Sequence, residues 1–399
     1  MSDTAERHVL IIVQNLSVPL DRRVWLECQT LVAADFDVSV VCPRGPQEER
    51  FEELDGVRIH RYRPAPAASG TLGYVAEFAY SWLATAWLTL RIFSRRRFGV
   101  LQACNPPDTF FLLALLLRPL GVRFVYDQHD LCPEVFVSRF GRDTGPALRG
   151  LRWLEAATYR SAHHVITVNE SYREVAMSRG RVPAGRITVV RSGPRPDRMR
   201  RADPVPELLE GRSHLCCYLG VMGPQDGVDL LIRAVDVLVN ERGRTDCQFA
   251  LLGFGDCLDD LRRQSSELGL DPWITFTGRA DDAMITEYLS TAALGLDPDP
   301  KNPLNDVSTM NKVLEYMAYE LPVVTFDLKE TRRSAEEAAY YVEPNDVRAF
   351  ADAIDRLLDD PERRAKMGQV GRRRIEDDLG WDKQAPRYLD VYREALKTG

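Results

Sequence analysis

The sequence has few lysines, no cysteine pair at the spacing of a zinc or thioredoxin site and no apolar segment of membrane-spanning length. Only six of its 52 basic residues are lysines, and none of them precedes position 301. None of the eight cysteines has a partner at the two-residue spacing of zinc or thioredoxin sites, so we expect reduced cysteines in an apolar interior. The uncharged segment Phe78–Leu90 has thirteen residues, which is too short to cross a bilayer. These absences argue against a zinc-binding, redox or membrane-spanning protein.

The composition is that of a soluble globular protein with two different halves. Hydrophobic residues make up 45% and charged residues 28% of the 399 residues. Residues 1–200 have a net charge of +6 and residues 201–399 of −13, which suggests two units with different partners and argues against nucleic-acid binding. Residues 1–6 are polar and lack the order of a signal peptide, so we expect a cytoplasmic protein, with the inner face of the membrane as an alternative location.

The segment Phe78–Leu90 has two interpretations. It is followed by four arginines, Arg91 and Arg95–Arg97. We favour a buried helix that packs on a sheet, and the alternative is an aromatic, arginine-flanked surface that rests on anionic lipid. A second short apolar segment, Phe110–Leu117, raises the same question.

Short apolar segments alternate with helical patterns along both halves, which predicts parallel sheets covered by helices on both faces. The strands expected in the first half are His8–Val13, Val38–Val41, Val57–Tyr62, Val100–Ala103, Arg123–Tyr126, His164–Val168 and Ile187–Val190. Those expected in the second half are Leu215–Leu219, Phe249–Leu252, Ile274–Thr277, Ala293–Leu296, Val323–Phe326 and Tyr340–Val342.

We therefore expect an N-terminal domain over residues 1–195, a linker over 196–212 and a second domain over 213–380. Residues 381–399 contain a helical pattern that either packs on the second domain or crosses back to the first. Ligands of such α/β domains bind at the carboxyl ends of the strands.

The segment from Asn305 to Ala318 carries the clearest chemical signal. Ser308 or Thr309 suits the N-cap of a helix, and Lys312 then falls in its first turn, where a cation opposes the helix dipole. A bound anion would reverse the sign of that interaction. Glu315 lies one turn further on the same face. Lys312 and Glu315 could together bind a diphosphate and a ribose, or they could form an ordinary ion pair on an exposed helix.

The second half strongly resembles glycosyltransferase family 4, retaining enzymes of the GT-B architecture. The segments that carry the resemblance are Gly220–Val239, Leu251–Gly255, Phe276–Arg279 and Lys312–Val324. The first half is similar to a subgroup with an Asp-Arg-Arg-Val loop at Asp21–Val24 and a His-Asp-Leu-x-Pro-Glu motif at His129–Glu134. The resemblance implies an α/β protein with two Rossmann-like, doubly wound domains that face a central cleft.

By this resemblance the second domain binds the nucleotide-sugar donor. Glu315 would bind the ribose, while Lys312 and the backbone amides of Met310 and Asn311 would bind the diphosphate. Ser308 and Thr309 belong to the same donor segment. Gly223, Gly253 and Gly255 would allow close approach of the nucleotide, and Arg279 would lie at the base. These positions complete the expected donor site.

The first domain would bind the acceptor. His129 follows a strand and is expected to act at the sugar or leaving group, so the catalytic set is His129, Lys312 and Glu315. Asp130 would orient the histidine or meet the acceptor. Arg22, Arg23 and Glu134 are weaker candidates for the same region, with a surface ion-pair cluster as the alternative.

Several positions depart from the family pattern. Val307 stands where the first of two glutamates is usual, and Val221 and Asp226 stand where basic residues usually hold the diphosphate. Glu320 replaces the glycine that normally ends the glutamate-bearing helix. A competing Asp-x-Asp motif, Asp297–Asp299, is interpreted as part of a loop rather than as a metal site.

The function that we expect is transfer of a hexosyl group from a nucleotide-diphosphate sugar, UDP- or GDP-linked, to a hydroxyl of a glycan, lipid-linked or small-molecule acceptor. The reaction is expected to retain anomeric configuration and to need no metal or other cofactor. The alternatives are a nucleotide-sugar 2-epimerase of the same fold and a non-catalytic nucleotide-sugar-binding protein. Peripheral membrane contact through the N-terminal domain is a further expectation.

Overall fold

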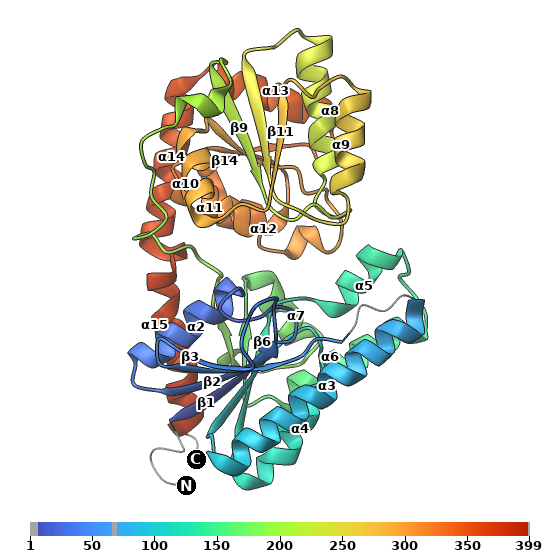
Figure 1. Ribbon diagram of the computed structural model, residues 1–399, viewed down its shortest axis with the longest axis vertical. Helices are drawn as coiled ribbons and strands as arrows, with labels where there is room; N and C mark the ends of the chain where they lie inside the picture. Colours follow the sequence, from blue (N-terminus) through green and yellow to red (C-terminus); the bar gives the residue numbers. More distant parts are fainter. Residues whose placement is uncertain (1–6, 66–69, 398–399) are drawn as a thin grey trace. The chain divides into compact units, whose positions relative to one another are not determined.

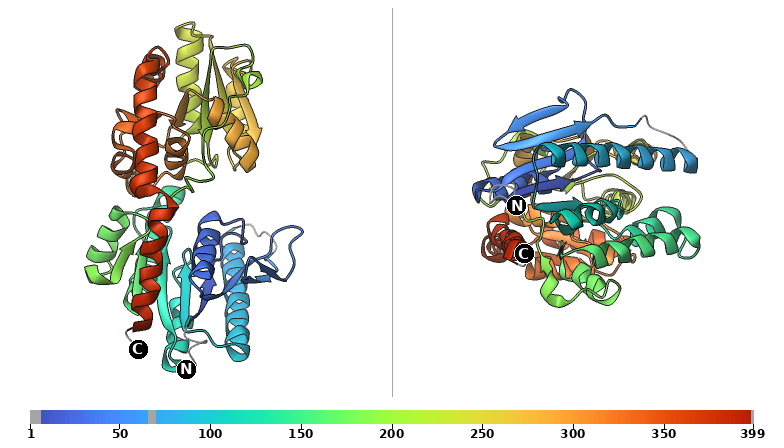
Figure 2. Two further views of the ribbon diagram at one scale, coloured as in Figure 1. Left: turned by 90° about the vertical axis from the view of Figure 1, so that its left-hand side faces the viewer. Right: turned by 90° about the horizontal axis from the view of Figure 1, so that it is seen from below.

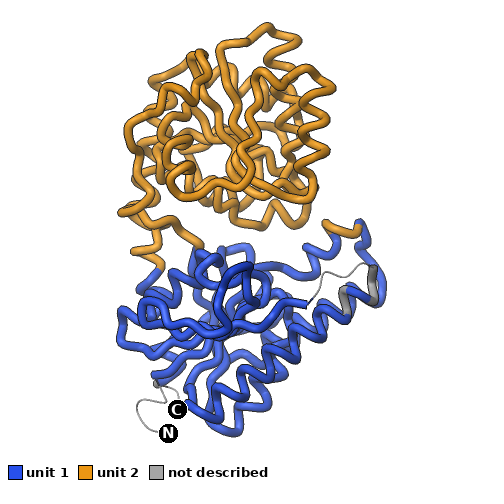
Figure 3. The backbone as a smooth tube through the Cα atoms, in the orientation of Figure 1, with its two compact units in different colours: residues 1–137, 141–191, 385–399 blue, residues 138–140, 192–384 orange. Residues whose placement is uncertain are grey.

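The computed structural model describes residues 7–65 and 70–397. The chain divides into two compact units (Figure 3). Unit 1 contains residues 1–137, 141–191 and 385–399, and unit 2 contains residues 138–140 and 192–384. Residues 1–6, on which the expectation about a signal peptide rests, lie outside the described residues.

Unit 1 is built on an eight-stranded sheet in the order β3-β4-β2-β1-β5-β6-β7-β8 (Figure 1). All neighbouring strands are parallel except β3 and β4. The strands are β1 (His8–Ile12), β2 (Asp37–Pro43), β3 (Phe51–Leu54), β4 (Val57–Tyr62), β5 (Val100–Cys104), β6 (Arg123–Gln128), β7 (His164–Thr167) and β8 (Ile187–Val189).

Helices cover both faces of this sheet. They are α2 (Arg22–Ala33), α3 (Gly70–Arg95), α4 (Phe111–Leu117), η1 (Arg118–Leu120), α5 (Cys132–Phe140), α6 (Pro146–Ser161), α7 (Glu170–Ser178) and η2 (Ala184–Arg186). The last helix, α15 (Trp381–Lys397), begins in unit 2 and continues into unit 1. α3, α4 and α6 share one apolar core with a single face of the sheet (Figure 2). α2 and α15 contact Gln102, whose side chain points to the other face from its neighbours Leu101 and Ala103.

Unit 2 is built on a six-stranded parallel sheet in the order β11-β10-β9-β12-β13-β14. The strands are β9 (His214–Leu219), β10 (Cys247–Leu252), β11 (Ile274–Gly278), β12 (Leu294–Asp297), β13 (Val323–Phe326) and β14 (Ala339–Val342). The helices are η3 (Pro206–Leu209), α8 (Val228–Asp236), η4 (Val237–Glu241), α9 (Leu258–Glu267), α10 (Asp282–Thr291), η5 (Asn305–Val307), α11 (Asn311–Ala318), α12 (Lys329–Ala335), η6 (Glu336–Ala338), α13 (Val347–Leu358), α14 (Pro361–Arg374) and η7 (Ile375–Leu379).

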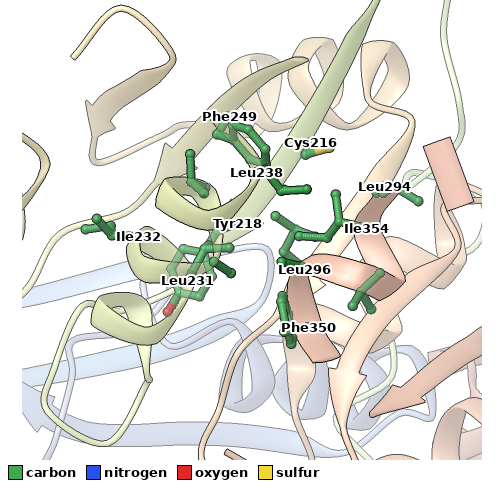
Figure 4. Packing of buried hydrophobic residues seen from close by; sticks show 14 of the residues in the cluster. Cys216, Tyr218, Leu231, Ile232, Leu238, Phe249, Leu294, Leu296, Phe350 and Ile354 are labelled. Carbon is green, nitrogen blue, oxygen red and sulfur yellow. The ribbon is translucent and has the colours of Figure 1, made fainter. Parts of the chain in front are cut away.

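The core of unit 2 lies between its sheet and flanking helices. Leu231 of α8 and Ile354 of α13 belong to one apolar core with Tyr218 and Phe249 of the strands (Figure 4). All four side chains are fully buried. Burial of each such side chain stabilises the fold by about 1.5–3 kcal/mol, so this core fixes the strand ends that carry the candidate site.

The prediction of doubly wound α/β units is confirmed, and each expected strand is present within two residues of its expected ends. β3 was not expected, because its four residues (FEEL) have one glutamate on each face and no buried side chain. All eight cysteines are free and six are buried, as expected. The segment 196–212, expected to be a linker, is part of unit 2, where Ala202 and Val205 donate backbone hydrogen bonds to the side chains of Ser290 and Thr291.

Two alternatives that the sequence left open concern where the last helix packs and what the segment Phe78–Leu90 forms. Residues of α15 from Ala385 onward belong to unit 1, where Tyr388 and Tyr392 are buried. The segment Phe78–Leu90 lies within the 26-residue helix α3, which buries one face on the sheet and leaves another exposed. In the described part of the chain, every helix is too short or too polar to cross a bilayer.

Candidate functional site

The carboxyl ends of four strands meet at one edge of the unit 2 sheet, where the strand order reverses. From β9 the order continues to β10 and β11 on one side and to β12 on the other. Open α/β sheets bind ligands at such a switch point. The loops that follow these strands are joined by backbone hydrogen bonds, from Gly220 N to Leu252 O (3.0 Å) and from Gly253 N to Gly278 O (2.9 Å).

Two of the predicted donor-site glycines permit this close packing of loops. A Cβ atom at Gly253 would overlap the carbonyl oxygen of Gly220, and one at Gly255 would lie 2.5 Å from the carbonyl oxygen of Met222. Gly223 differs, because a Cβ there would meet only side-chain atoms of the following loop. Packing alone therefore requires Gly253 and Gly255, and their contact with a donor stays a prediction.

Helix α11 begins near this edge, but not with the expected cap. Met310 is the N-cap and makes no side-chain capping hydrogen bond, so the prediction of Ser308 or Thr309 as N-cap is wrong. The Ser308 hydroxyl donates instead to the carbonyl oxygen of Leu304 (2.8 Å), because the short helix η5 precedes it. Lys312 is the second residue of α11 and lies in its first turn, as expected.

Tyr316 fixes α11 to the switch point. Its hydroxyl donates to the carbonyl oxygen of Leu296 at the end of β12 (3.1 Å) and accepts from the backbone N–H of Leu219 at the end of β9 (2.8 Å). Its ring occupies the space that a side chain at Gly295 would fill. The first turn of α11 is therefore held beside the loops after β9 and β12.

The Lys312 ammonium lies beside two buried aspartates, Asp297 at the end of β12 and Asp299 two residues later. Nζ forms an ion pair with Asp299 Oδ2 and lies 3.5 Å from Asp297 Oδ1. The side chains of Lys312, Asp297 and Asp299 are 10%, 0% and 3% exposed. Nζ also lies 5.3 Å from the centre of the Tyr218 ring. Asp299 lies in the loop after β12, as interpreted, whereas Asp297 is the last residue of β12, and both carboxylates enclose the lysine.

The charges in this cluster shift one another's pKa values. Burial would lower the pKa of Lys312, but Asp299 and its neighbours outweigh that effect and raise it well above its usual value. Burial raises the pKa of Asp299 well above its usual value, against the opposing effect of Lys312. Burial also raises the pKa of Asp226, and the positive charge of Lys312 opposes this effect. Asp226 accepts a hydrogen bond from Gly223 N (2.8 Å). The cluster is thus rich in acid around a single cation.

The remaining donor candidates lie around this cluster. Glu315 is half-buried on α11, three residues after Lys312. Arg279, directly after β11, is exposed, and its guanidinium lies 5.1 Å from the centre of the Phe254 ring. Phe254 is itself 46% exposed. A flat, partly apolar surface with a cation is thus available beside the glycine loops.

In unit 1, His129 follows β6 and belongs to a buried ion-pair group. Its Nε2 atom lies 2.9 Å from Asp127 Oδ2 and 3.2 Å from Arg23 Nε. Arg23 also donates to Asp127 Oδ1 (3.1 Å) and to the carbonyl oxygen of Val190 (2.9 Å). Burial would lower the pKa of His129, but Asp127 outweighs it, so the pKa is raised. His129 is therefore held in place and favoured in its protonated form.

This group extends to the C-terminal helix. Gln102 Nε2 donates to Asp127 Oδ2 (2.9 Å) and to Glu27 Oε2 (2.8 Å). Its Oε1 accepts from the hydroxyls of Tyr388 (2.7 Å) and Tyr392. Burial, reinforced by Asp127, raises the pKa of Glu27 to about 8. The position of His129 thus depends on residues from α2, β5, β6 and α15.

Other first-domain candidates have different surroundings. Asn105 Oδ1 accepts from the backbone N–H groups of His129 (2.7 Å) and Asp130 (3.1 Å), so it shapes the loop that presents them. Burial raises the pKa of Asp130. Glu134 forms an ion pair with Arg179 (2.7 Å), which supports the alternative of a structural ion-pair cluster.

The two arginines of the Asp21–Val24 loop also differ. Arg22 is exposed, whereas Arg23 is 9% exposed and belongs to the His129 group. Asp21 caps α2 by accepting from Val24 N (3.1 Å).

One set of side chains in this group has the composition of a metal site. Among the described residues, one ligand atom from each of Cys104, Asp127 and His129 lies within 4.8 Å of the others. The Arg23 guanidinium donates to the same aspartate and lies 3.2 Å from the histidine Nε2 atom. A bound cation would have to displace this buried arginine, so the donor set does not fit a resident metal.

Sequence reasoning missed Asp127, Gln102, Glu27 and the role of Asp297 and Asp299. One signal was available for Asp127, because residues two apart at the end of a strand lie on the same side, which pairs it with His129. The Asp297–Asp299 pair offered a similar signal, since it follows a strand and precedes the first-turn lysine.

Comparisons with known proteins cover both units. The family model described as "Glycosyl transferase 4-like domain" matches residues 20–193, and the model "Glycosyl transferases group 1" matches residues 213–360. The chain is 27% identical over 343 residues to an alpha-D-kanosaminyltransferase of Streptomyces kanamyceticus, which covers 82% of this chain and 86% of that protein. It is 28% identical over 171 residues to a GDP-mannose-dependent phosphatidylinositol monomannoside mannosyltransferase of Corynebacterium glutamicum, with 42% of this chain and 44% of that one covered.

Solved structures show the same fold. A sucrose-phosphate synthase from Thermosynechococcus elongatus superimposes with a TM-score of 0.78 at 18% identity, with 98% of this chain and 100% of that chain covered. Anabaena HepE in complex with UDP and glucose gives a TM-score of 0.71 at 15% identity, with 98% of each chain covered. Together with the family models and the relatives, this fold shows that the chain belongs to the GT-B glycosyltransferases of the family 4 type, which use nucleotide sugars.

Proposed function

We propose that the protein transfers a hexosyl group from a UDP- or GDP-sugar to an acceptor hydroxyl, with retention of configuration and without a metal. The observation that carries the proposal is the position of Lys312, in the first turn of α11 and at the switch point of the unit 2 sheet. The amides of this turn and the ammonium together suit a diphosphate. UDP and GDP are the first candidates because HepE binds UDP and the mannosyltransferase relative depends on GDP-mannose.

The acidic surroundings of Lys312 suggest how the cation is kept for the donor. Burial favours the neutral form of Asp299, so this carboxyl is ready to hold a proton when the ammonium leaves it. The ammonium is then free to stabilise the charge that develops on the leaving diphosphate. Glu315 would bind the ribose, and the Arg279–Phe254 surface would lie at the base.

In unit 1, the proposal gives His129 the role of a hydrogen-bond donor to the transferred sugar or the leaving group. Its raised pKa supports this role, because the protonated ring donates from both nitrogens. Asp130 and Arg22 remain candidates for contact with the acceptor. No carboxylate has been identified as a covalent nucleophile, so displacement on the front face of the sugar is the proposed route to retention.

The experiment that tests the donor site compares three variants by calorimetric titration with UDP and GDP. Asp299→Asn keeps the ammonium and removes one competing charge, so we expect nucleotide binding equal to or tighter than that of the wild type. Asp299→Asn combined with Lys312→Met removes the cation without leaving two buried carboxylates, and we expect at least tenfold weaker binding. Lys366→Met, at an exposed lysine of α14, is the control.

Equal nucleotide affinity in Asp299→Asn and in the double variant would refute the role of Lys312 in diphosphate binding. For the reaction, NMR of the product measures retention, and unchanged turnover in a chelator is expected for a metal-independent enzyme. Incubation of the nucleotide sugar without acceptor tests the 2-epimerase alternative. Tight donor binding without transfer to any acceptor would favour the non-catalytic alternative.

A further inference from the structure

A basic pocket lies in unit 1 between α3 and the β3–β4 edge of the sheet. Its volume is about 530 Å³. The residues that line it include His8, His60, Phe51 and Trp87, and none of the lining residues is acidic. Its arginines are Arg50, Arg58, Arg61, Arg91, Arg95 and Arg96. The residues assigned to donor or acceptor binding do not line this pocket.

Three of these arginines have structural partners outside the pocket lining. Arg58 and Arg96 both form ion pairs with Asp37. Arg61 is buried and forms ion pairs with Glu52 (2.8 Å) and with a second glutamate of the β2–β3 loop. These contacts keep the pocket wall in place.

The other three arginines leave the pocket with unbalanced positive charge. In the described parts of the chain, no carboxylate forms an ion pair with Arg50, Arg91 or Arg95, and all three are exposed. The surroundings of His60 reflect this charge, because burial together with Arg58 and Arg91 lowers its pKa to about 4. The charge of this pocket suits a phosphate group, and its volume leaves room for the headgroup that carries the phosphate.

An apolar stripe on α3 continues from the mouth of the pocket. Tyr80, Leu83, Trp87 and Leu90 follow one another at spacings of three or four residues and so share one helical face. They are 44%, 63%, 59% and 40% exposed. Trp87 belongs to both features, since it lines the pocket and its ring lies 5.0 Å from the Arg91 guanidinium.

The neighbouring helices extend this apolar face. α4 exposes Leu112, Leu115 and Leu116, and α6 exposes Trp153, which is 62% exposed. α3, α4 and α6 share one core and lie on the same side of the unit 1 sheet (Figures 1 and 2). Monomeric soluble proteins seldom expose so many large apolar side chains together.

The charge of these helices matches an anionic surface. Their only two acidic residues are Glu77 and the buried Glu155. Exposed arginines on α3 and α6 are Arg91, Arg95, Arg149, Arg152 and Arg160, and Arg118 is exposed directly after α4. Aromatic and aliphatic side chains combined with arginines are typical of proteins that lie on anionic bilayers.

We propose that the pocket between α3 and the β3–β4 edge binds the phosphate headgroup of an anionic lipid, while the exposed stripe of α3 and α4 contacts the acyl boundary of the same bilayer. The occupant is a lipid surface, because the basic pocket and the apolar stripe meet at Trp87. A free anion would use only the pocket, and a protein partner would need no phosphate site. The proposal is independent of the donor site in unit 2.

The test is co-sedimentation of the full chain with vesicles of phosphatidylcholine alone or with 30% phosphatidylglycerol. We expect binding to the anionic vesicles that weakens as salt is added. Arg91→Gln with Arg95→Gln should weaken this binding at least tenfold, since each arginine near such a surface contributes about fivefold. Leu83→Gln with Leu116→Gln should weaken it at least tenfold as well. UDP and GDP binding, measured by calorimetry, should not change in any of these variants.

Matched controls use exposed residues elsewhere. Met177→Gln on α7 and Arg262→Gln with Arg263→Gln on α9 should leave vesicle binding unchanged. Absence of binding to anionic vesicles, or binding insensitive to both test pairs, would overturn the proposal. Saturation by glycerol phosphate without vesicle binding would identify a free-anion site instead. A dimer in light scattering that dissociates in Leu83→Gln with Leu116→Gln would identify a second copy as the occupant.

Discussion

The buried ion-pair cluster at Lys312 predicts a specific pattern of stability in three variants. Lys312→Met removes the ammonium and leaves Asp297 and Asp299, which are 0% and 3% exposed, without a cation. At the Nζ–Oδ1 distance of 3.5 Å to Asp297, Coulomb's law with an effective dielectric constant of about 20 gives an attraction of roughly 5 kcal/mol. Removal of one partner from a buried pair typically costs about 3–5 kcal/mol.

We therefore expect Lys312→Met to lower the free energy of unfolding by about 3–5 kcal/mol near pH 7. Asp299→Asn alone should cost less, because Asp297 still balances the ammonium and the new amide can accept a hydrogen bond from it. Lys312→Met combined with Asp299→Asn should be more stable than Lys312→Met alone by about 1–3 kcal/mol, since the amide carries no charge and needs no proton in the buried cluster.

The assay is urea unfolding followed by circular dichroism, with Lys366→Met as the matched control at an exposed lysine. A loss below about 1 kcal/mol in Lys312→Met would show that the ion pair is a weakly coupled surface contact. Equal stability of Lys312→Met with and without Asp299→Asn would refute the reasoning in a second way, because the two residues would then not interact.

Three further predictions concern stability. Burial raises the pKa of Glu27 from its usual value near 4.5 to about 8. The folded state therefore holds an extra proton between these pH values, and the free energy of unfolding should fall as the pH rises across them. Glu27→Gln should abolish this pH dependence in urea titrations at several pH values. Tyr388→Phe with Tyr392→Phe leaves the buried Gln102 Oε1 without its two donors and should lower the melting temperature, with a loss of about 1–3 kcal/mol. Glu320 has a left-handed φ of 58°, so Glu320→Gly should raise the free energy of unfolding by up to about 1 kcal/mol, measured by urea titration.

The fold could be predicted because its strands carry local signals. In β1, for example, all four residues after His8 are apolar, as expected for a strand that is buried on both faces. β3 lacks this signal because it is an edge strand with exposed and half-buried side chains only. The apolar segment Phe78–Leu90 marks only part of α3, because the rest of that helix has no continuous apolar segment.

The candidate site was only partly predictable, because its polar contacts join residues far apart in the sequence. Lys312 was expected in a first helical turn and is found there, but its cap was assigned to the wrong residue. The cap prediction used local propensity, and the short helix η5 takes up the Ser308 side chain instead. Gln102 and Tyr388 are 286 positions apart, so no local sequence pattern predicts the hydrogen bond between them.

The departures from the family pattern have a common electrostatic consequence in unit 2. Val221 and Asp226 stand where basic residues are usual, and Asp226 adds negative potential at Lys312. At the donor site that we propose, the diphosphate and the Asp299 carboxyl would therefore compete for one ammonium. A carboxyl whose pKa is raised by burial yields that ammonium at a smaller cost than a fully ionised one, because it takes up a proton as the cation departs. The acidic cluster is thus compatible with the role that we propose for Lys312, in which Asp299 takes up a proton from solvent when the ammonium turns to the diphosphate.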